Sequence, residues 1–523
     1  MKTIPYRKFT SQSRWRKVLA LVIVIGVPLS AFLYLYSCID SYTAFTHSFS
    51  AYQVDYNAMI PANYTRLDQM AMAYEHVLIT NHLPLNYTVS AYWNANFSSI
   101  SSYMSTGDAS IWSGMTLAAA CFEYAAAKRE GNATLQASAL LLVKRLVQGV
   151  SLLLAVPNGG IGPNYSGVLA RAVSPKNWNS SHPPLAGFPY GKPADNVNVF
   201  NGAGNYSDWY WIGYNSLDQY SGIVMGVSCA AALVDDPWVK GQVKLLATQM
   251  LEFFKKTNWY LADGNGRTTG QAFLYKPEHA GAWLLATLFM GVLVDPATYK
   301  PLYYQWAIDR GYADPHVLYN DLSMFNLFNY YSTNINWVIM YALATFETNP
   351  TLRTDYQQLM KDDMYPVVAN QRNAWFNMMY LNVMNTTDPN IKKDVEDQLM
   401  RFDIERIPGL ANSTKLPERG INATGNTATL VPANAPRHTF AQWLATQPLY
   451  PAASVNLATS IVGNTAYLEA PKTVDQYPND DFAWQSNPWL VSQYSPAHLE
   501  DSGLSFLLPY WMGRYCGMIK EGS

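Results

Sequence analysis

Two aspartates have the surroundings expected of a catalytic acid pair. Asp108 lies in the segment 107–114 (GDASIWSG) and Asp218 in the segment 216–222 (SLDQYSG), so each is followed by an aromatic residue and a glycine. A pair of carboxyl groups can cleave a glycosidic bond, one protonating the leaving oxygen while the other activates water. We expect this inverting arrangement, which requires a separation of roughly 6.5–9.5 Å between the carboxyl groups.

Other polar and aromatic residues could bind a substrate beside this pair. Arg171 follows the glycine-rich run 159–163 and could hold a carboxylate, and tryptophans could stack on sugar rings. The substrate-binding candidates are Trp112, Arg171, Trp209, Trp211, Gln219, Tyr220, Glu278 and His279.

Each candidate also has a structural explanation. Asp108 and Asp218 could be helix N-caps, a position that aspartate favours. Arg171 could pack against loop backbone, and the aromatic residues of 209–214 could fill the interior. The segment 263–266 (DGNG) resembles part of a calcium loop but lacks the remaining ligand spacing, which favours a plain turn.

Several chemistries lack their motifs in this sequence. There is no His-Glu-x-x-His, no Cys-x-x-Cys, no phosphate-binding loop with lysine and no Gly-x-Ser-x-Gly. We therefore predict no metal and no cofactor. Cys121, Cys229 and Cys516 each lie in an apolar helical run and are expected to be buried small side chains.

The candidates are positioned by helices, because apolar residues recur at helical spacing while β-type alternation is scarce. The fold class is therefore all-α. We predict helices at 66–83, 109–130, 133–156, 218–234, 236–259, 277–293, 296–310, 320–347 (broken), 351–383 (broken), 388–407 and 503–519.

Short and long connections alternate along these helices. The connections 130–133, 234–236 and 293–296 suit helical hairpins, whereas 157–217 and 408–500 are long loops that usually carry function. This alternation predicts an α/α toroid with the long loops at one end, where Asp108 and Asp218 would meet. A helical-repeat solenoid is the alternative, but no fixed repeat period is visible.

The segments 107–114, 216–222 and 508–515 (LPYWMGRY) resemble those of a poorly characterised group of envelope proteins. Over most of 66–519 the organisation is similar to that of six-hairpin glycosidase-like proteins. This resemblance implies an α/α toroid and carbohydrate as the partner. Such relatives include hydrolases, lyases and epimerases, so the resemblance does not fix the reaction. No catalytic motif carries over residue by residue.

The N-terminal region predicts membrane attachment. Basic residues in 1–17 precede the uncharged stretch 18–37, which is about 30 Å long as a helix and would cross a bilayer with its basic end in the cytoplasm. A cleaved signal peptide, or lipoprotein processing at Cys38, are alternatives that also place the domain outside. We divide the chain into a cytoplasmic tail (1–17), a signal anchor (18–37), a stalk (38–65) and an extracytoplasmic domain (66–523).

The composition agrees with a domain outside the cytoplasm. Charged residues make up 14% of the chain, against roughly 25% in an average protein. Without the six basic residues of the tail, 29 Lys and Arg stand against 37 Asp and Glu, a net charge near −8. This balance argues against a nucleic acid partner. Candidate glycosylation sites begin at Asn63, Asn86, Asn96, Asn132, Asn164, Asn179, Asn205, Asn385, Asn412 and Asn422.

Three functional hypotheses follow. The first is a glycoside hydrolase of the cell surface that uses Asp108 and Asp218. The second is a lyase or epimerase for acidic sugars, with Tyr220 or His279 as the base and Arg171 holding the carboxylate. The third is a glycan-binding or structural surface protein without catalysis.

Overall fold

The computed structural model describes residues 54–190, 198–272, 281–315, 317–318, 331–404, 430–432, 465–467, 470–476 and 498–522, together with residues 26 and 28. The predicted tail (1–17), all of the predicted anchor (18–37) except these two residues, and most of the loop 408–500 therefore lie outside the description. Within the described residues one helix, Ala133–Asn158, is long and apolar enough to cross a membrane, but most of it is buried inside the protein.

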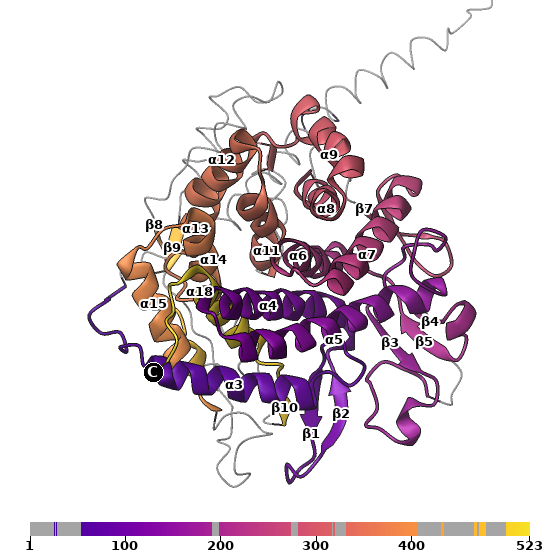
Figure 1. Ribbon diagram of the computed structural model, residues 1–523, viewed down its shortest axis with the longest axis horizontal. Coiled ribbons are helices and arrows are strands. Elements are labelled where there is room, and N and C mark those ends of the chain that lie inside the picture. Colours follow the sequence, from indigo (N-terminus) through magenta and orange to yellow (C-terminus); the bar gives the residue numbers. More distant parts are fainter. Residues whose placement is uncertain are drawn as a thin grey trace, which may run out of the picture.

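The described chain is mostly helical, which confirms the predicted class (Figure 1). The predicted break within 351–383 is also found, at residues 369–373. The α-helices of the described residues are α3 (Tyr64–Asn81), α4 (Ala109–Glu130), α5 (Ala133–Asn158), α6 (Leu217–Leu233), α7 (Pro237–Lys256), α8 (Gly281–Val294), α9 (Pro296–Tyr304), α11 (Tyr331–Phe346), α12 (Pro350–Leu359), α13 (Tyr365–Val368), α14 (Ala374–Met384), α15 (Pro389–Met400) and α18 (Leu504–Cys516).

Local signals explain where the hairpins turn. Helix α4 ends at Gly131, whose φ of 74° is accessible to glycine at little cost, and the next residue, Asn132, caps α5 through a bond from Leu135 N. Asp236 caps α7 in the same way, followed by Pro237 in the first turn. The three predicted short connections are thus confirmed as helical hairpins.

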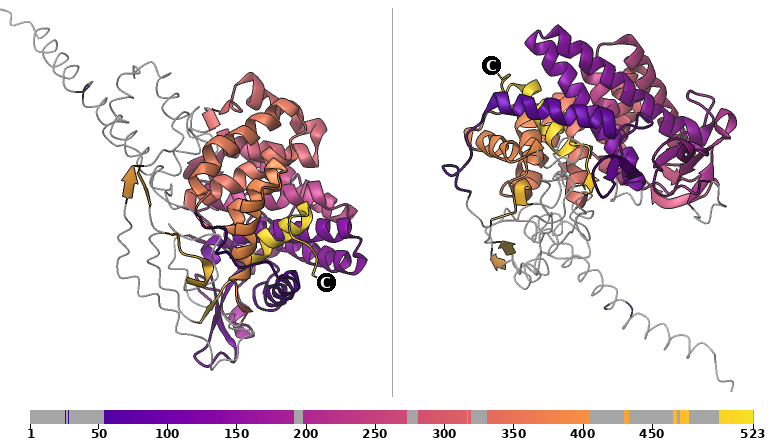
Figure 2. Two further views of the ribbon diagram at one scale, coloured as in Figure 1. Left: turned by 90° about the vertical axis from the view of Figure 1, so that its left-hand side faces the viewer. Right: turned by 90° about the horizontal axis from the view of Figure 1, so that it is seen from below.

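The helices pack in two sets (Figures 1 and 2). In the first set α4 contacts α6, α6 contacts α8, α8 contacts α11, α11 contacts α14, α14 contacts α18, and α18 returns to α4. Helices α5, α7, α9, α12, α15 and α3 lie against members of that series, respectively α4, α6, α8, α11, α14 and α18, and α7 also contacts α8. The first set is the more deeply buried: every residue of α4 from Ile111 to Ala127 except Trp112 is buried.

Glycines allow α4 and α6 to touch backbone to backbone. A Cβ atom on Gly114 would lie 2.1 Å from the carbonyl carbon of Gly222, and one on Gly222 would lie 2.3 Å from the carbonyl oxygen of Ile111. A Cβ atom on Gly226 would lie 2.2 Å from the carbonyl oxygen of Gly114. No other residue type fits these positions without moving a helix, so the glycines fix how the two helix starts lie together.

Short strands lie between the helices, and the sequence pattern did not reveal them because each has at most five residues. One sheet has the order β10–β1–β2, formed by Leu499–Glu500, Ser90–Trp93 and Ile100–Met104. Another has the order β3–β5–β4, formed by Ala172–Pro175, Trp209–Ile212 and Val199–Asn201. The remaining pairs are β6 (Tyr260–Ala262) with β7 (Thr268–Ala272), and β8 (Leu430–Pro432) with β9 (Thr465–Tyr467).

A buried arginine joins the C-terminal helix to the first helices. Arg514 of α18 is 2% exposed and pairs with Asp68 of α3 at 2.7 Å and with Glu130 of α4 at 2.6 Å. The C-terminal residues accordingly lie beside α3 (Figure 1). Cys121 and Cys229 are free and buried, and Cys516 is free and partly buried, in agreement with the sequence-based expectation.

Candidate functional site

The starts of α4 and α6 place the two predicted acids at one location. Asp108 is the residue before α4, but its side chain makes no capping hydrogen bond. Asp218 lies inside the first turn of α6, and the N-cap is Ser216, which forms a capping box with Gln219. The alternative explanation, that Asp218 is the N-cap of its helix, is therefore wrong. Since neither carboxylate caps a helix, both are available for other contacts.

Gln219 joins the two acids through a single amide nitrogen. Its Nε2 donates to Asp108 Oδ1 over 2.9 Å and to Asp218 Oδ2 over 3.3 Å. Its Oε1 accepts a bond from the backbone N of Ser216 at 2.9 Å, which fixes the orientation of the amide. Gln219 is fully buried, whereas the Asp108 side chain is about half exposed and is reached by solvent.

The second close contact of Asp108 is with Arg171, which follows the buried segment 168–170 and precedes β3. Its Nη1 lies 3.6 Å from Asp108 Oδ1 and donates to the carbonyl oxygen of Gly107 over 2.8 Å. Its Nε donates to the carbonyl oxygen of Tyr214 over 3.0 Å and its Nη2 to Ser216 Oγ over 3.3 Å. Arg171 therefore packs against loop backbone, one of the two explanations that the sequence left open.

These neighbours act on the acidity of Asp108 in opposite directions. Burial of the carboxyl group is the largest influence and raises the pKa of Asp108, and the negative charge of Asp218 raises it further. The positive charge of Arg171 and the hydrogen bond from Gln219 lower it, but only in part. An aspartate with a raised pKa beside a second carboxylate is the arrangement expected of a general acid.

The shared donor limits the distance between the acids. Oδ1 of Asp108 and Oδ2 of Asp218 can be no farther apart than the two hydrogen bonds laid end to end, 2.9 Å and 3.3 Å. That upper limit lies between the roughly 5–5.5 Å separation of retaining glycosidases and the roughly 6.5–9.5 Å of inverting ones. These two oxygen atoms thus lie closer together than the inverting range expected from the sequence, and their contact with one amide also permits the retaining spacing.

Tyr220 and Trp211 serve the packing of the domain. Tyr220 is 1% exposed, its hydroxyl oxygen accepts a bond from Leu169 N, and burial raises its pKa above the ordinary value. Trp211 of β5 is also 1% exposed and stacks on Phe200. Trp209 is partly buried and packs edge-on against Tyr206.

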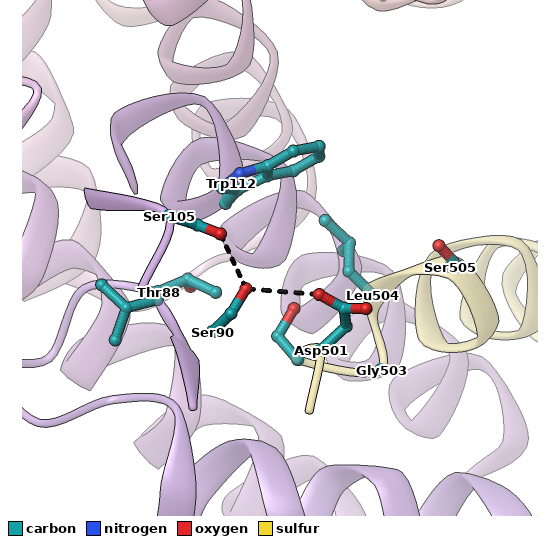
Figure 3. Close-up of a pocket in the computed structure, with 10 residues that line it drawn as sticks. Thr88, Ser90, Ser105, Trp112, Asp501, Gly503, Leu504 and Ser505 are labelled. Atoms are coloured by element: carbon teal, nitrogen blue, oxygen red, sulfur yellow. Dashed lines mark hydrogen bonds between the residues drawn. The ribbon is translucent and has the colours of Figure 1, made fainter. Parts of the chain in front are cut away.

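Trp112 has a different environment, one turn along α4 from Asp108. It is partly exposed and lines a cavity together with Ser90, Ser105 and the segment 501–505 (Figure 3). Glu278 and His279 lie outside the described residues, so their predicted roles remain predictions.

Tyr214 contacts the same residues, although it is not one of the substrate-binding candidates named from the sequence. The residue is 54% exposed, and its backbone has a φ of 59°, which is unusual for a bulky residue. Two contacts hold this conformation: Arg171 Nε on its carbonyl oxygen, and Asp263 Oδ1, which accepts from its N over 3.1 Å. The run of aromatic residues at 209–214 was the available signal, but it did not separate the exposed ring from the buried ones.

The segment 263–266 forms a turn between β6 and β7. Gly266 N donates to the carbonyl oxygen of Asp263 over 2.8 Å, and Asp263 Oδ1 accepts from the backbone of Tyr214 and Gly264. The turn that the sequence favoured is confirmed. Among the residues that the structure describes, no cluster of His, Cys, Asp and Glu could hold a metal ion.

Comparison with known proteins found no similarity from which to infer a function. No protein-family model, no curated protein and no solved structure matches this chain.

Proposed function

We propose that this protein is a carbohydrate-active enzyme, a glycoside hydrolase that uses Asp108 and Asp218 as its carboxyl pair. The observation that carries the proposal is the bridging of both carboxylates by the one amide nitrogen of Gln219. Glycosidic cleavage requires two neighbouring carboxyl groups, one of which keeps its proton long enough to donate it. Asp108, with its raised pKa, and Asp218 provide such a pair, and both are partly exposed to solvent.

Each acid has a defined role in this proposal. Asp108, which holds its proton more tightly than an ordinary aspartate, protonates the departing glycosidic oxygen. Asp218 attacks the anomeric carbon, and water then releases the sugar while Asp108 takes the proton back, so the net reaction is hydrolysis with retained configuration. This double displacement requires a separation of roughly 5–5.5 Å between the carboxyl groups, a spacing that the shared Gln219 amide permits.

The fold that we propose around this site is an α/α toroid of the six-hairpin type. The series of contacts that runs from α4 through α6, α8, α11, α14 and α18 back to α4 supports it, as does the partner helix beside each member. In such a fold, helices that start at the same end bring their N-termini together, as α4 and α6 do. The basic tail and uncharged stretch of 1–37 support a membrane anchor with this domain outside the cytoplasm.

The test is a screen of polysaccharides and oligosaccharides for released reducing ends, using the full chain in a detergent without a sugar headgroup. Asp108→Asn and Asp218→Asn should each lower the turnover by about 100-fold or more while glycan binding on an array persists. The matched control is Asp235→Asn, which changes an exposed acid in the α6–α7 connection.

Proton NMR of the first product adds a second readout, because the proposed double displacement predicts a product with the anomeric configuration of the substrate, whereas direct attack by water predicts the opposite configuration. Turnover that survives both substitutions would refute the proposal. Binding without turnover in the unmodified protein would instead indicate a glycan-recognition protein.

A lyase that uses Arg171 and Tyr220 has less support from the site. The Arg171 guanidinium already donates to Gly107, Tyr214 and Ser216, and Tyr220 is buried behind the acids. Neither group is placed to meet a uronic acid.

A further inference from the structure

A polar cavity opens near the start of α4, close to Asp108 in the sequence. Its volume is about 40 Å³, and it is lined by residues 88–90, Ser105, Trp112 and residues 501–505 (Figure 3). Ser105 and Asp108 are joined by one tight turn, in which Asp108 N donates to the carbonyl oxygen of Ser105 over 3.1 Å. Trp112 follows one turn later on α4, so the cavity and the acid pair share the start of this helix.

Strand pairing explains why residues so distant in the sequence converge here. In the sheet β10–β1–β2, Ala91 pairs with Glu500 and Ser90 pairs with Met104. Ser90 therefore lies at the beginning of the central strand, while Asp501 and Ser105 directly follow the two neighbouring strands. The three side chains meet at one end of the sheet, facing the start of α4.

Ser90 links the polar groups of the cavity. Its Oγ lies 3.0 Å from Ser105 Oγ and 3.3 Å from Asp501 Oδ1 (Figure 3). A serine hydroxyl has one proton, so Ser90 can donate to only one of these two acceptors at a time. An incoming hydroxyl group could donate to the other acceptor, and its own oxygen could accept from a serine.

Trp112 contributes an apolar surface to the cavity, opposite the polar side chains of Ser90 and Asp501 (Figure 3). Figure 3 shows its indole across the cavity from Ser90 and Asp501. An indole face suits the C–H groups of a sugar ring, whereas a carboxylate and serine hydroxyls suit its O–H groups. The volume has room for on the order of three water molecules, which fits one substituted edge of a ring rather than a whole sugar.

We propose that this cavity is a subsite that binds two neighbouring hydroxyl groups, or a hydroxymethyl group, of a sugar unit next to the bond that the acid pair cleaves. The inference rests on the proposed function for its place in the reaction, but not for the binding itself. Asp501 and Ser90 hold the hydroxyl groups, and Trp112 covers the ring edge.

Binding is measured by saturation-transfer NMR on the full chain, in a detergent without a sugar headgroup. The probes are the methyl glycosides of glucose, galactose, mannose and xylose, the last of which lacks the hydroxymethyl group. We expect at least one probe to bind. Ser90→Ala and Asp501→Asn should each weaken its binding about tenfold, as expected for the loss of a hydrogen bond in a partly buried site.

Ser101→Ala is the matched control, because Ser101 lies on the same sheet and its exposed hydroxyl bonds to the carbonyl oxygen of Tyr92 instead. The subsite proposal would be overturned if none of the probes binds the unmodified protein. It would also be overturned if Ser90→Ala and Asp501→Asn bind every probe as well as the unmodified protein does. The Asp108→Asn/Asp218→Asn double variant separates the two proposals. If it binds the probes normally and the unmodified protein shows no turnover, the subsite stands and the hydrolase proposal fails.

Discussion

The side-chain amide of Gln219 donates to Oδ1 of Asp108 over 2.9 Å, which ties the first turn of α6 to the residue that precedes α4. The same nitrogen reaches Asp218 at 3.3 Å. Because Gln219 also forms the capping box of α6, its side chain both orients the acids and closes the helix end. A residue that acts on both acids without reacting itself should affect the pH dependence of catalysis as well as stability.

We predict that Gln219→Met lowers the free energy of unfolding by roughly 1–3 kcal/mol, because methionine has a similar length but no amide. The lost hydrogen bond also stabilised the ionised form of Asp108, so the pKa of Asp108 should rise further. If Asp108 is the general acid, the alkaline limb of the pH–rate profile moves to higher pH. Urea unfolding and a pH series of initial rates check the two effects, and an unshifted alkaline limb would contradict the assignment.

The glycine contacts between α4 and α6 give a second prediction. Gly222→Ala would place a methyl group 2.3 Å from the carbonyl oxygen of Ile111, so one helix must shift. We expect a loss of roughly 1–3 kcal/mol in the free energy of unfolding, together with reduced turnover, because the acids sit on the displaced helix ends.

Gly241→Ala provides the control for that substitution. Gly241 lies inside α7, and a Cβ atom there meets nothing within 4 Å. Alanine at that position should stabilise the protein by about 0.5–1 kcal/mol. Equal stability changes in the two variants, measured by urea unfolding, would show that the close approach of α4 and α6 is unimportant.

The helices were predictable because their signals are local. The short turns at Gly131 and at Asp236 with Pro237 are set by backbone preferences that act over a few residues. The meeting of Asp108 and Asp218 followed from the alternating direction of the helices. The N-cap residue of α6 could not be predicted in this way, because serine and aspartate are both good N-caps and the sequence places them two residues apart.

The cavity beside β1 depends on contacts that are not local. Ser90 and Asp501 are separated by 411 positions, and β10, which aligns them, has two residues. Such a strand leaves no periodic pattern to detect. Likewise, the burial of Trp211 and the exposure of Tyr214 are decided by the packing of Phe200 and by contacts from Arg171 and Asp263, which no pattern within 209–214 encodes.

Arg514 links α18 to α3 and α4 through ion pairs with Asp68 and Glu130, and the contribution of these pairs to stability can be measured. Arg514→Met removes the guanidinium from Asp68 and Glu130, which keep their contacts with Tyr510 and Arg129, so we expect a loss of up to roughly 3–5 kcal/mol in the free energy of unfolding. Lys128→Met is the comparison, since its pair with Asp235 is more than half exposed on both sides and should be screened by solvent. If both variants unfold at the same urea concentration, the ion pairs of Arg514 contribute no more to the free energy of unfolding than the exposed pair of Lys128 and Asp235.

Glu123 of α4 provides the clearest pH-dependent prediction for stability. Its side chain is 1% exposed, and its Oε1 has no hydrogen-bond partner among the described residues. Burial raises the pKa of Glu123 well above the ordinary value, and the nearby Glu75 of α3 raises it further. The pKa of Glu75 is itself raised by burial. The folded state therefore holds these protons more tightly than the unfolded state.

The sign of the effect follows from that difference. At low pH the carboxyl group of Glu123 is neutral in both the folded and the unfolded state, and its contribution to stability is fully present. This contribution falls as the pH rises from the ordinary pKa of 4.5 through the raised pKa of the folded protein. Glu123→Gln keeps the shape and cannot ionise. We expect it to unfold at a higher urea concentration than the unmodified protein near neutral pH and at the same concentration near pH ~4. Destabilisation at neutral pH would instead mean that Glu123 is ionised and paired in the folded protein.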